Sequence, residues 1–105
     1  MKYPLFGAAL LAALASSAVL AADPPPAAVK AGCTACHAQD RKLVGPAYKD
    51  VATKYKGEAD AVAKLSDKVR KGGSGVWGPI PMPPNGVDKI GDVELKTTIE
   101  WVLKS

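Results

Sequence analysis

The sequence is short of the residues from which most metal and disulfide sites are built. Among its 105 residues are two cysteines and one histidine. A structural zinc site usually takes four cysteine or histidine ligands, which this chain does not provide. The two cysteines, Cys33 and Cys36, lie three positions apart, so a disulfide between them would close a very small loop and brace almost nothing.

Several patterns are absent as well. No segment alternates polar and apolar residues with a period of two, so we expect no half-buried strands. No βαβ pattern accompanies the two cysteines, which disfavours a thioredoxin-like dithiol. There are no internal repeats, and no motif combines basic and aromatic residues in the manner of a nucleic-acid-binding surface. These absences predict an all-α domain that does not bind nucleic acid.

Residues 1–22 have the pattern of a cleaved secretory signal peptide. Lys2 supplies the positive start, and an apolar run rich in Ala and Leu extends from Leu5 to Leu20. Small residues allow cleavage after Ala21 or Ala22. The run is too short for a typical membrane span, so a retained membrane anchor is the weaker alternative. We therefore expect export to the periplasm without stable membrane insertion.

Residues 23–105 are then expected to form one domain of 83 residues. Lys2 is the only charged residue removed with the signal peptide, so the net charge falls from +4 to +3. A chain this short buries little apolar surface and usually needs a disulfide or a cofactor for stability. The modest positive charge, with acidic residues interspersed, favours weakly steered encounters with partners.

The most informative segment is Cys33-Thr34-Ala35-Cys36-His37. Cys-x-x-Cys-His is the attachment signature of c-type haem. Two thiols at this spacing face the same side of a short helix, so each can add to one vinyl group of a single porphyrin. The histidine that follows turns its imidazole onto the iron. We predict one covalently bound haem c, which would also supply apolar surface to a small core.

Two helices are expected in the first half of the domain. An extended, proline-rich lead-in precedes a short helix from about Pro26 through Cys36, packed through alanines. The segment 41–46 is a loop, and Pro46 suits the first position of the next helix. That helix presents an amphipathic face before it ends at Gly57, formed by Tyr48, Val51, Ala52 and Tyr55.

Two further helices are expected in the second half. One runs from about Glu58 to Lys71 and is stopped by a pair of glycines. Its inward residues are Val62, Leu65 and Val69. The last helix begins near Asp92, a good N-cap residue. Its buried stripe consists of Leu95, Thr98, Ile99, Val102 and Leu103, with Trp101 beside it.

Residues 72–87 contain nine glycines and prolines in sixteen positions, so they cannot form regular structure. A loop this long in a small domain is usually functional or disordered. Apolar residues interleaved with the prolines argue against disorder. The prolines instead stiffen the segment, which suits a loop that must present one side chain accurately.

Met82 is the best-placed candidate for the second axial position of a histidine-ligated haem. Met1 belongs to the signal peptide, His37 is the only histidine, and Tyr48 or a lysine is a poorer candidate. Core methionines usually lie on helix faces, whereas Met82 stands between two prolines in a loop. A haem iron with both positions filled has no open site, which favours electron transfer over catalysis or gas binding.

Two alternatives stay open at this point. If Met82 only packs, the haem is five-coordinate and the protein binds a gas or turns over peroxide. A weaker alternative is a thiol oxidoreductase without haem.

The residues that surround these ligands resemble the small bacterial class I cytochromes c of the cytochrome c-551 type. The resemblance runs from Gly32 onward and rests on the haem motif, on VGPAYKDV at 44–51, on GVWGPIPMPPN at 75–85 and on WVL at 101–103. It implies an all-α fold of about four helices wrapped around one covalently attached haem, and an electron carrier rather than an enzyme.

The resemblance also implies the roles of individual residues. Cys33 and Cys36 would form the thioethers, while His37 and Met82 would be the axial ligands of the iron. The Pro46 carbonyl would accept a hydrogen bond from the His37 ring. Two further residues would complete the site: Trp77 would reach a haem propionate and Asn85 would steady the methionine loop.

The partners that the resemblance implies are redox proteins. They are periplasmic reductases or oxidases, notably nitrite reductase, and membrane cytochrome complexes. A monomer is the default state for such a shuttle.

Overall fold

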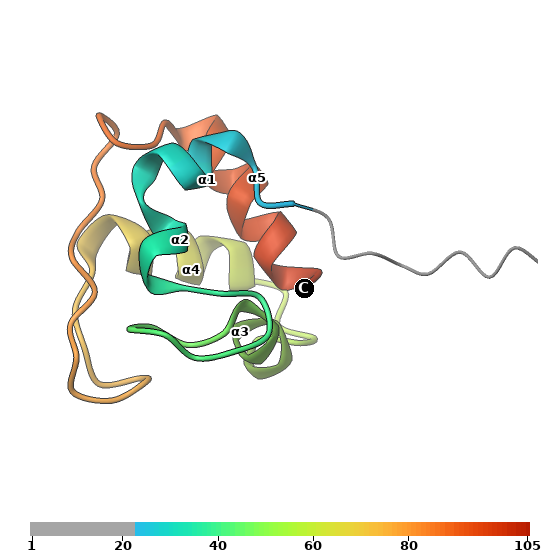
Figure 1. Ribbon diagram of the computed structural model, residues 1–105. Helices are drawn as coiled ribbons and strands as arrows, with labels where there is room; N and C mark the ends of the chain where they lie inside the picture. Colours follow the sequence, from blue (N-terminus) through green and yellow to red (C-terminus); the bar gives the residue numbers. More distant parts are fainter. Residues whose placement is uncertain (1–22) are drawn as a thin grey trace, which may run out of the picture.

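The C-terminal helix α5 (Asp92–Leu103) is the element against which three other helices of the domain pack. The computed structural model describes residues 23–105, so the predicted signal peptide and its cleavage site lie outside the described residues. Figure 1 shows α5 running beside α1 (Pro26–Ala31) and across α4 (Ala61–Lys71). It also contacts α3 (Tyr48–Lys54), which lies at the other end of the domain.

The core is built on the face of α5 that the sequence pattern indicated. Leu95, Ile99 and Val102 follow one another at spacings of four and three and are all buried. They form one cluster with four buried residues from other segments: Tyr48, Val51, Leu65 and Ile90. Burying each large aliphatic side chain contributes about 1.5–3 kcal/mol, so this cluster is the main apolar contribution of the chain itself.

The expected helix from Pro26 through Cys36 is wrong in one respect, because the structure divides it into two. Gly32 adopts a left-handed conformation (φ 90°) that ends α1, and α2 (Cys33–Cys36) begins directly after it. Its amide donates to Val29 O, which closes the last turn of α1. The domain therefore has five helices over residues 23–105, and the turn at Gly32 sets the direction of the cysteine-bearing helix.

The start of one helix and the cap of another also differ from expectation. α4 begins at Ala61 rather than near Glu58, because residues 58–60 form a turn in which Glu58 and Asp60 both pair with Lys64. Asp92 does not cap α5: the N-cap residue is Gly91, without a side-chain cap. The Asp92 carboxylate instead accepts a hydrogen bond from Arg70 on α4. The all-α prediction is confirmed, since residues 23–105 contain only two isolated bridges besides the helices.

Residues 72–85, here called the methionine loop, leave the end of α4 without forming a helix. Figure 1 shows the segment between α4 and α5 as an extended excursion at the edge of the domain. Gly73 and Met82 pair across this excursion through two backbone hydrogen bonds of 2.9 and 3.0 Å. The loop is therefore a long hairpin-like arm whose two sides meet next to Met82.

Among residues 23–105, no helix is both long enough and apolar enough to cross a membrane.

Candidate haem site

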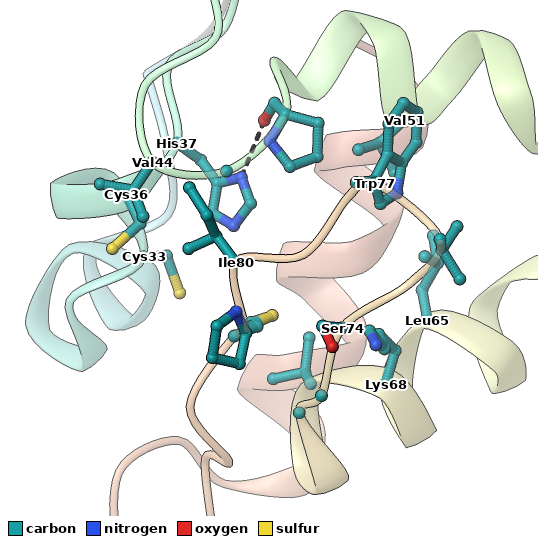
Figure 2. A pocket seen from close by; sticks show the side chains of 18 of the residues that line it. Cys33, Cys36, His37, Val44, Val51, Leu65, Lys68, Ser74, Trp77 and Ile80 are labelled. Atoms are coloured by element: carbon teal, nitrogen blue, oxygen red, sulfur yellow. Dashed lines mark hydrogen bonds between the residues drawn. The ribbon is translucent and has the colours of Figure 1, made fainter.

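One cavity of about 690 Å³ brings the four predicted haem-binding side chains together. Cys33, Cys36 and His37 reach it from α2, and Met82 reaches it from the methionine loop, 45 positions further along the chain than His37. Figure 2 shows Cys33, Cys36 and His37 on one side of the cavity and Trp77 and Leu65 across from them. Cavities of this size hold most cofactors.

The His37 ring is fixed by three neighbours. Its Nδ1 lies 2.8 Å from the Pro46 carbonyl oxygen, marked by the dashed line in Figure 2. Because that carbonyl can only accept, Nδ1 carries the proton and Nε2 is left with a lone pair for a metal. The Gly45 backbone lies against the ring, which stacks on Tyr48 with the ring centroids 5.3 Å apart.

Because Gly45 has no side chain, the His37 ring has space beside the backbone. A Cβ on Gly45 would clash with the ring, with Nδ1 at 2.8 Å and Nε2 at 3.0 Å and Cε1 closer still. The amide of Gly45 donates to Cys36 O at 2.7 Å, so the segment before α3 is held against the end of α2. Sequence reasoning assigned Gly45 no role, although its place before Pro46 indicated a tight turn.

Both cysteine thiols are free and partly exposed to the cavity. Burial raises the pKa of the Cys33 thiol, a backbone hydrogen bond opposes this rise, and the proximity of Cys36 adds to it. Two thiols at the entrance of one apolar cavity are suited to the attachment of a single apolar group. A disulfide bridge between them would instead brace only α2.

Tyr48 forms the floor of the site between His37 and the C-terminal helix. Its ring meets Trp101 edge-on at 5.1 Å. Burial raises the pKa of Tyr48 well above its usual range, with smaller contributions from Cys33 and Cys36. The phenol oxygen is buried and has no hydrogen-bond partner among residues 23–105.

The remaining walls are largely apolar and fit the flat face of a porphyrin. They come from helices α3, α4 and α5 and from two loops, and include Val44, Val51, Leu65, Val69, Ile80, Ile99 and Val102. Sulfur and imidazole donors with an apolar lining are the combination by which proteins hold haem iron. The described residues contain no cluster of three or more His, Cys, Asp or Glu side chains that could hold a metal ion by themselves.

The predicted residues around the ligands occupy different positions. Pro46 and Trp77 line the cavity, and Trp77 is 39% exposed with the Lys54 ammonium 5.8 Å from its ring centroid. Asn85 lies behind the cavity wall, where its side-chain amide donates to Pro83 O at 3.0 Å. Lys68 and Ser74, which sequence reasoning did not single out, also line the cavity and lie close together in Figure 2.

The comparisons with known proteins show the family of the chain. The family model of cytochrome c matches residues 26–105. The chain belongs to the cytochrome c family. Cytochrome c-551 of Pseudomonas aeruginosa is 51% identical over 100 residues, which cover 90% of this chain and 93% of that protein. Cytochrome c-552 of Hydrogenobacter thermophilus is 56% identical over 72 residues, covering 69% of this chain and 70% of that protein.

Solved structures give the same result for the fold of this cytochrome. The crystal structure of wild-type Nitrosomonas europaea cytochrome c552 has a TM-score of 0.69 and 46% sequence identity, and covers 74% of this chain and 94% of that chain. The predicted resemblance and fold class are thus confirmed. This cytochrome is a small electron-transfer protein that binds haem c covalently, and it is an electron carrier rather than an enzyme.

Proposed function

We propose that this cytochrome is a periplasmic shuttle for single electrons, with Cys33 and Cys36 as the thioether residues and His37 and Met82 as the axial ligands of the iron. The observation that carries the proposal is the single cavity in which two thiols, one imidazole and one thioether meet. Haem c supplies the one-electron chemistry by alternating between its ferric and ferrous states. One electron arrives from a donor and leaves to an acceptor, and no atom is transferred.

The chain itself orients the ligands and limits access of water to the site. Pro46 fixes the tautomer of His37, so that Nε2 faces the cavity as the donor atom. The methionine loop presents Met82 from the far side. A thioether is a soft, neutral ligand that favours the ferrous state, so Met82 raises the reduction potential relative to a nitrogen or oxygen ligand.

The partners of the shuttle are redox proteins that approach the exposed edge of the site. We infer that a periplasmic reductase or oxidase, such as nitrite reductase, accepts the electron and that a membrane cytochrome complex donates it. The cavity wall includes Lys42 and Lys68, and Lys54 lies over Trp77. These ammonium groups favour acidic docking surfaces.

The pattern of residues 1–22 supports export, with cleavage leaving residues 23–105 as one domain in the periplasm. A monomer suits a shuttle that must dissociate from each partner after the transfer of one electron.

Substitution of Met82 tests the axial ligand. In Met82→Ala the ferric protein should lose the weak far-red absorption band of sulfur–iron ligation, bind water or an added ligand, and show a lower potential. Met82→His should keep six-coordination and lower the potential, which separates the ligand from its packing. An unchanged ferric spectrum and potential in Met82→Ala would show that Met82 only packs and that the site is open.

A further inference from the structure

Arg70, in the last turn of α4, binds three groups at the end of the methionine loop and just beyond it. Its Nη1 donates to Ile90 O at 2.6 Å and to Asn85 O at 3.2 Å. Its Nη2 donates to the Asp92 carboxylate at 2.6 Å. The Arg70 side chain is only 21% exposed, so its hydrogen bonds to the two carbonyls are partly buried.

The methionine loop has little else to hold it on the domain. The backbone hydrogen bonds of residues 73–84 are made within the loop itself, between Gly73 and Met82 and from Gly75 to Gly78 O. The loop is instead attached at its two ends. At the start the Gly72 backbone amide donates to Lys68 O at 2.7 Å, and at the end Asn85 is buried and donates its backbone amide to Val69 O at 2.9 Å.

Arg70 reinforces the second attachment. Asn85 is bound to α4 through its own amide and, by way of its carbonyl oxygen, to the Arg70 guanidinium. Only two residues separate Asn85 from Met82, and both are prolines, Pro83 and Pro84, which are stiff. A shift of Asn85 away from α4 is therefore transmitted along this short rigid segment to the Met82 sulfur.

We propose that Arg70 is a positioning residue for Met82: it locks the outgoing end of the methionine loop onto α4 and thereby sets how readily the sulfur leaves the haem iron. This inference rests on the proposed role of Met82 as a ligand. The planar guanidinium reaches two carbonyls and one carboxylate at once, which a single ammonium group cannot do. Asp92 is 87% exposed, so the contacts with the two carbonyls are the part that matters for the loop.

The test compares four variants of the haem-loaded protein with the wild type: Arg70→Met, Arg70→Lys, Asp92→Asn and Arg41→Met. Arg41 is the only other arginine, and its side chain is exposed and pairs with the adjacent Asp40, so it is the matched control. Two quantities are followed in the ferric protein. The first is the temperature at which the far-red band is lost, compared with the temperature at which the helices melt by circular dichroism. The second is the affinity for added imidazole.

In Arg70→Met the band should disappear about 10 °C or more before the helices melt, whereas the two transitions should lie closer together in the wild type. Its affinity for imidazole should rise about tenfold, because the open form of the loop is more populated. Arg70→Lys should fall between Arg70→Met and the wild type. Asp92→Asn should lower the helix transition slightly without separating the two, and Arg41→Met should match the wild type.

If the loss of the far-red band and the loss of helix shift by the same temperature in both Arg70 variants, and the imidazole affinity is unchanged, the proposal is overturned. Arg70 is then a merely structural residue. If Arg70→Met fails to fold with haem, Arg70→Lys alone decides between the two outcomes. A wild-type band that persists in Met82→Ala would instead reject Met82 as the ligand, which is a separate failure.

Discussion

The imidazole of His37 has almost no freedom to rotate. Its Nδ1 is bound to Pro46 O, the backbone of Gly45 blocks one side and the Tyr48 ring stacks on it. A ring held in this way is already oriented before it binds a metal, which reduces the entropy lost on ligation.

Gly45→Ala should therefore disturb the ligand directly. The added methyl would occupy the space of the His37 ring, which costs about 1–3 kcal/mol in a packed site and tilts the imidazole. We expect a lower midpoint of unfolding in denaturant and a changed ferric spectrum. Gly57→Ala is the matched control: it has a positive φ of 81° but open space around its Cβ, so it should lower stability without changing the spectrum. Identical spectra for both variants would contradict this account of Gly45.

Tyr48 should give the plot of protein stability against pH a descending part at alkaline pH, here called the alkaline limb. Since burial raises the pKa of Tyr48, the phenol is neutral in both folded and unfolded chains below pH about 10, and its contribution is then complete. Above that pH the unfolded chain loses the proton while the folded chain keeps it. The free energy of unfolding should then fall by up to about 1.4 kcal/mol per pH unit through this one group.

Tyr48→Phe should lack this limb while keeping the ring contacts with His37 and Trp101. Guanidinium unfolding of both proteins between about pH 9 and about pH 11.5 measures the difference. The wild type should lose stability faster than the variant as the pH rises. Equal slopes would mean that the hydroxyl of Tyr48 ionises as readily in the folded protein as in the unfolded chain.

At the scale of elements, the turn between α1 and α2 determines where the two thiols point. Gly32 has a φ of 90°, and nothing lies within 4 Å of the position of its Cβ. The requirement for glycine is therefore conformational rather than steric. Gly32→Ala should cost about 1–2 kcal/mol, measured as a lower midpoint of unfolding in denaturant, and Gly32→Asn should cost less because asparagine tolerates this conformation. A larger loss in the asparagine variant would argue against this reason.

The elements that were predictable are those whose pattern is local. The apolar spacing in 95–102 and the glycines and prolines of 72–87 predicted α5 and the long loop, and the structure has both. The division at Gly32 was missed, because the helix pattern of the sequence continues across this glycine. Only its left-handed backbone conformation marks the end of α1. Asp92 also fitted the pattern of an N-cap residue, but its carboxylate accepts a hydrogen bond from Arg70, a residue distant in the sequence.

The residues of the site also divide into those that a local sequence pattern predicted and those that it did not. Cys33, Cys36 and His37 form a motif, and the prolines beside Met82 marked it as a presented side chain. Arg70 gave no signal, because its partners lie 15–22 positions away and two of them are backbone carbonyls, which have no residue signature.

At the scale of the whole molecule, the chain alone has a hollow centre. A cavity of about 690 Å³ lies among 83 described residues, and no large side chain in them is fully buried. Replacing both Cys33 and Cys36 by Ala should therefore give a largely unfolded chain, because the core without haem is too small for a stable domain. Far-ultraviolet circular dichroism and a thermal melt measure this. Native helicity with a cooperative melt in the haem-free variant would contradict it.

The surface charges should give electron transfer a shallow salt dependence. Two of the lysines that line the cavity, Lys64 and Lys71, are paired with acidic neighbours, which limits the local positive field. With a domain charge of only +3, the rate of reduction of an acidic partner should fall less than about tenfold between ~10 mM and ~150 mM salt. Stopped-flow kinetics at several ionic strengths measure this. A steeper fall would show that Lys42, Lys54 and Lys68 act as a concentrated patch.

The position of α5 also has a consequence for the timing of folding. The helix that contacts α1, α3 and α4 consists of residues 92–103, so the core lacks its central partner until this stretch has been synthesised. A ribosome-bound chain that has reached only residue 91 has all of the haem motif and the methionine loop, yet lacks Leu95, Ile99 and Val102, three of the seven residues of the buried cluster. Such a chain stays partly open while it is being made, and its core closes only when the last helix joins it.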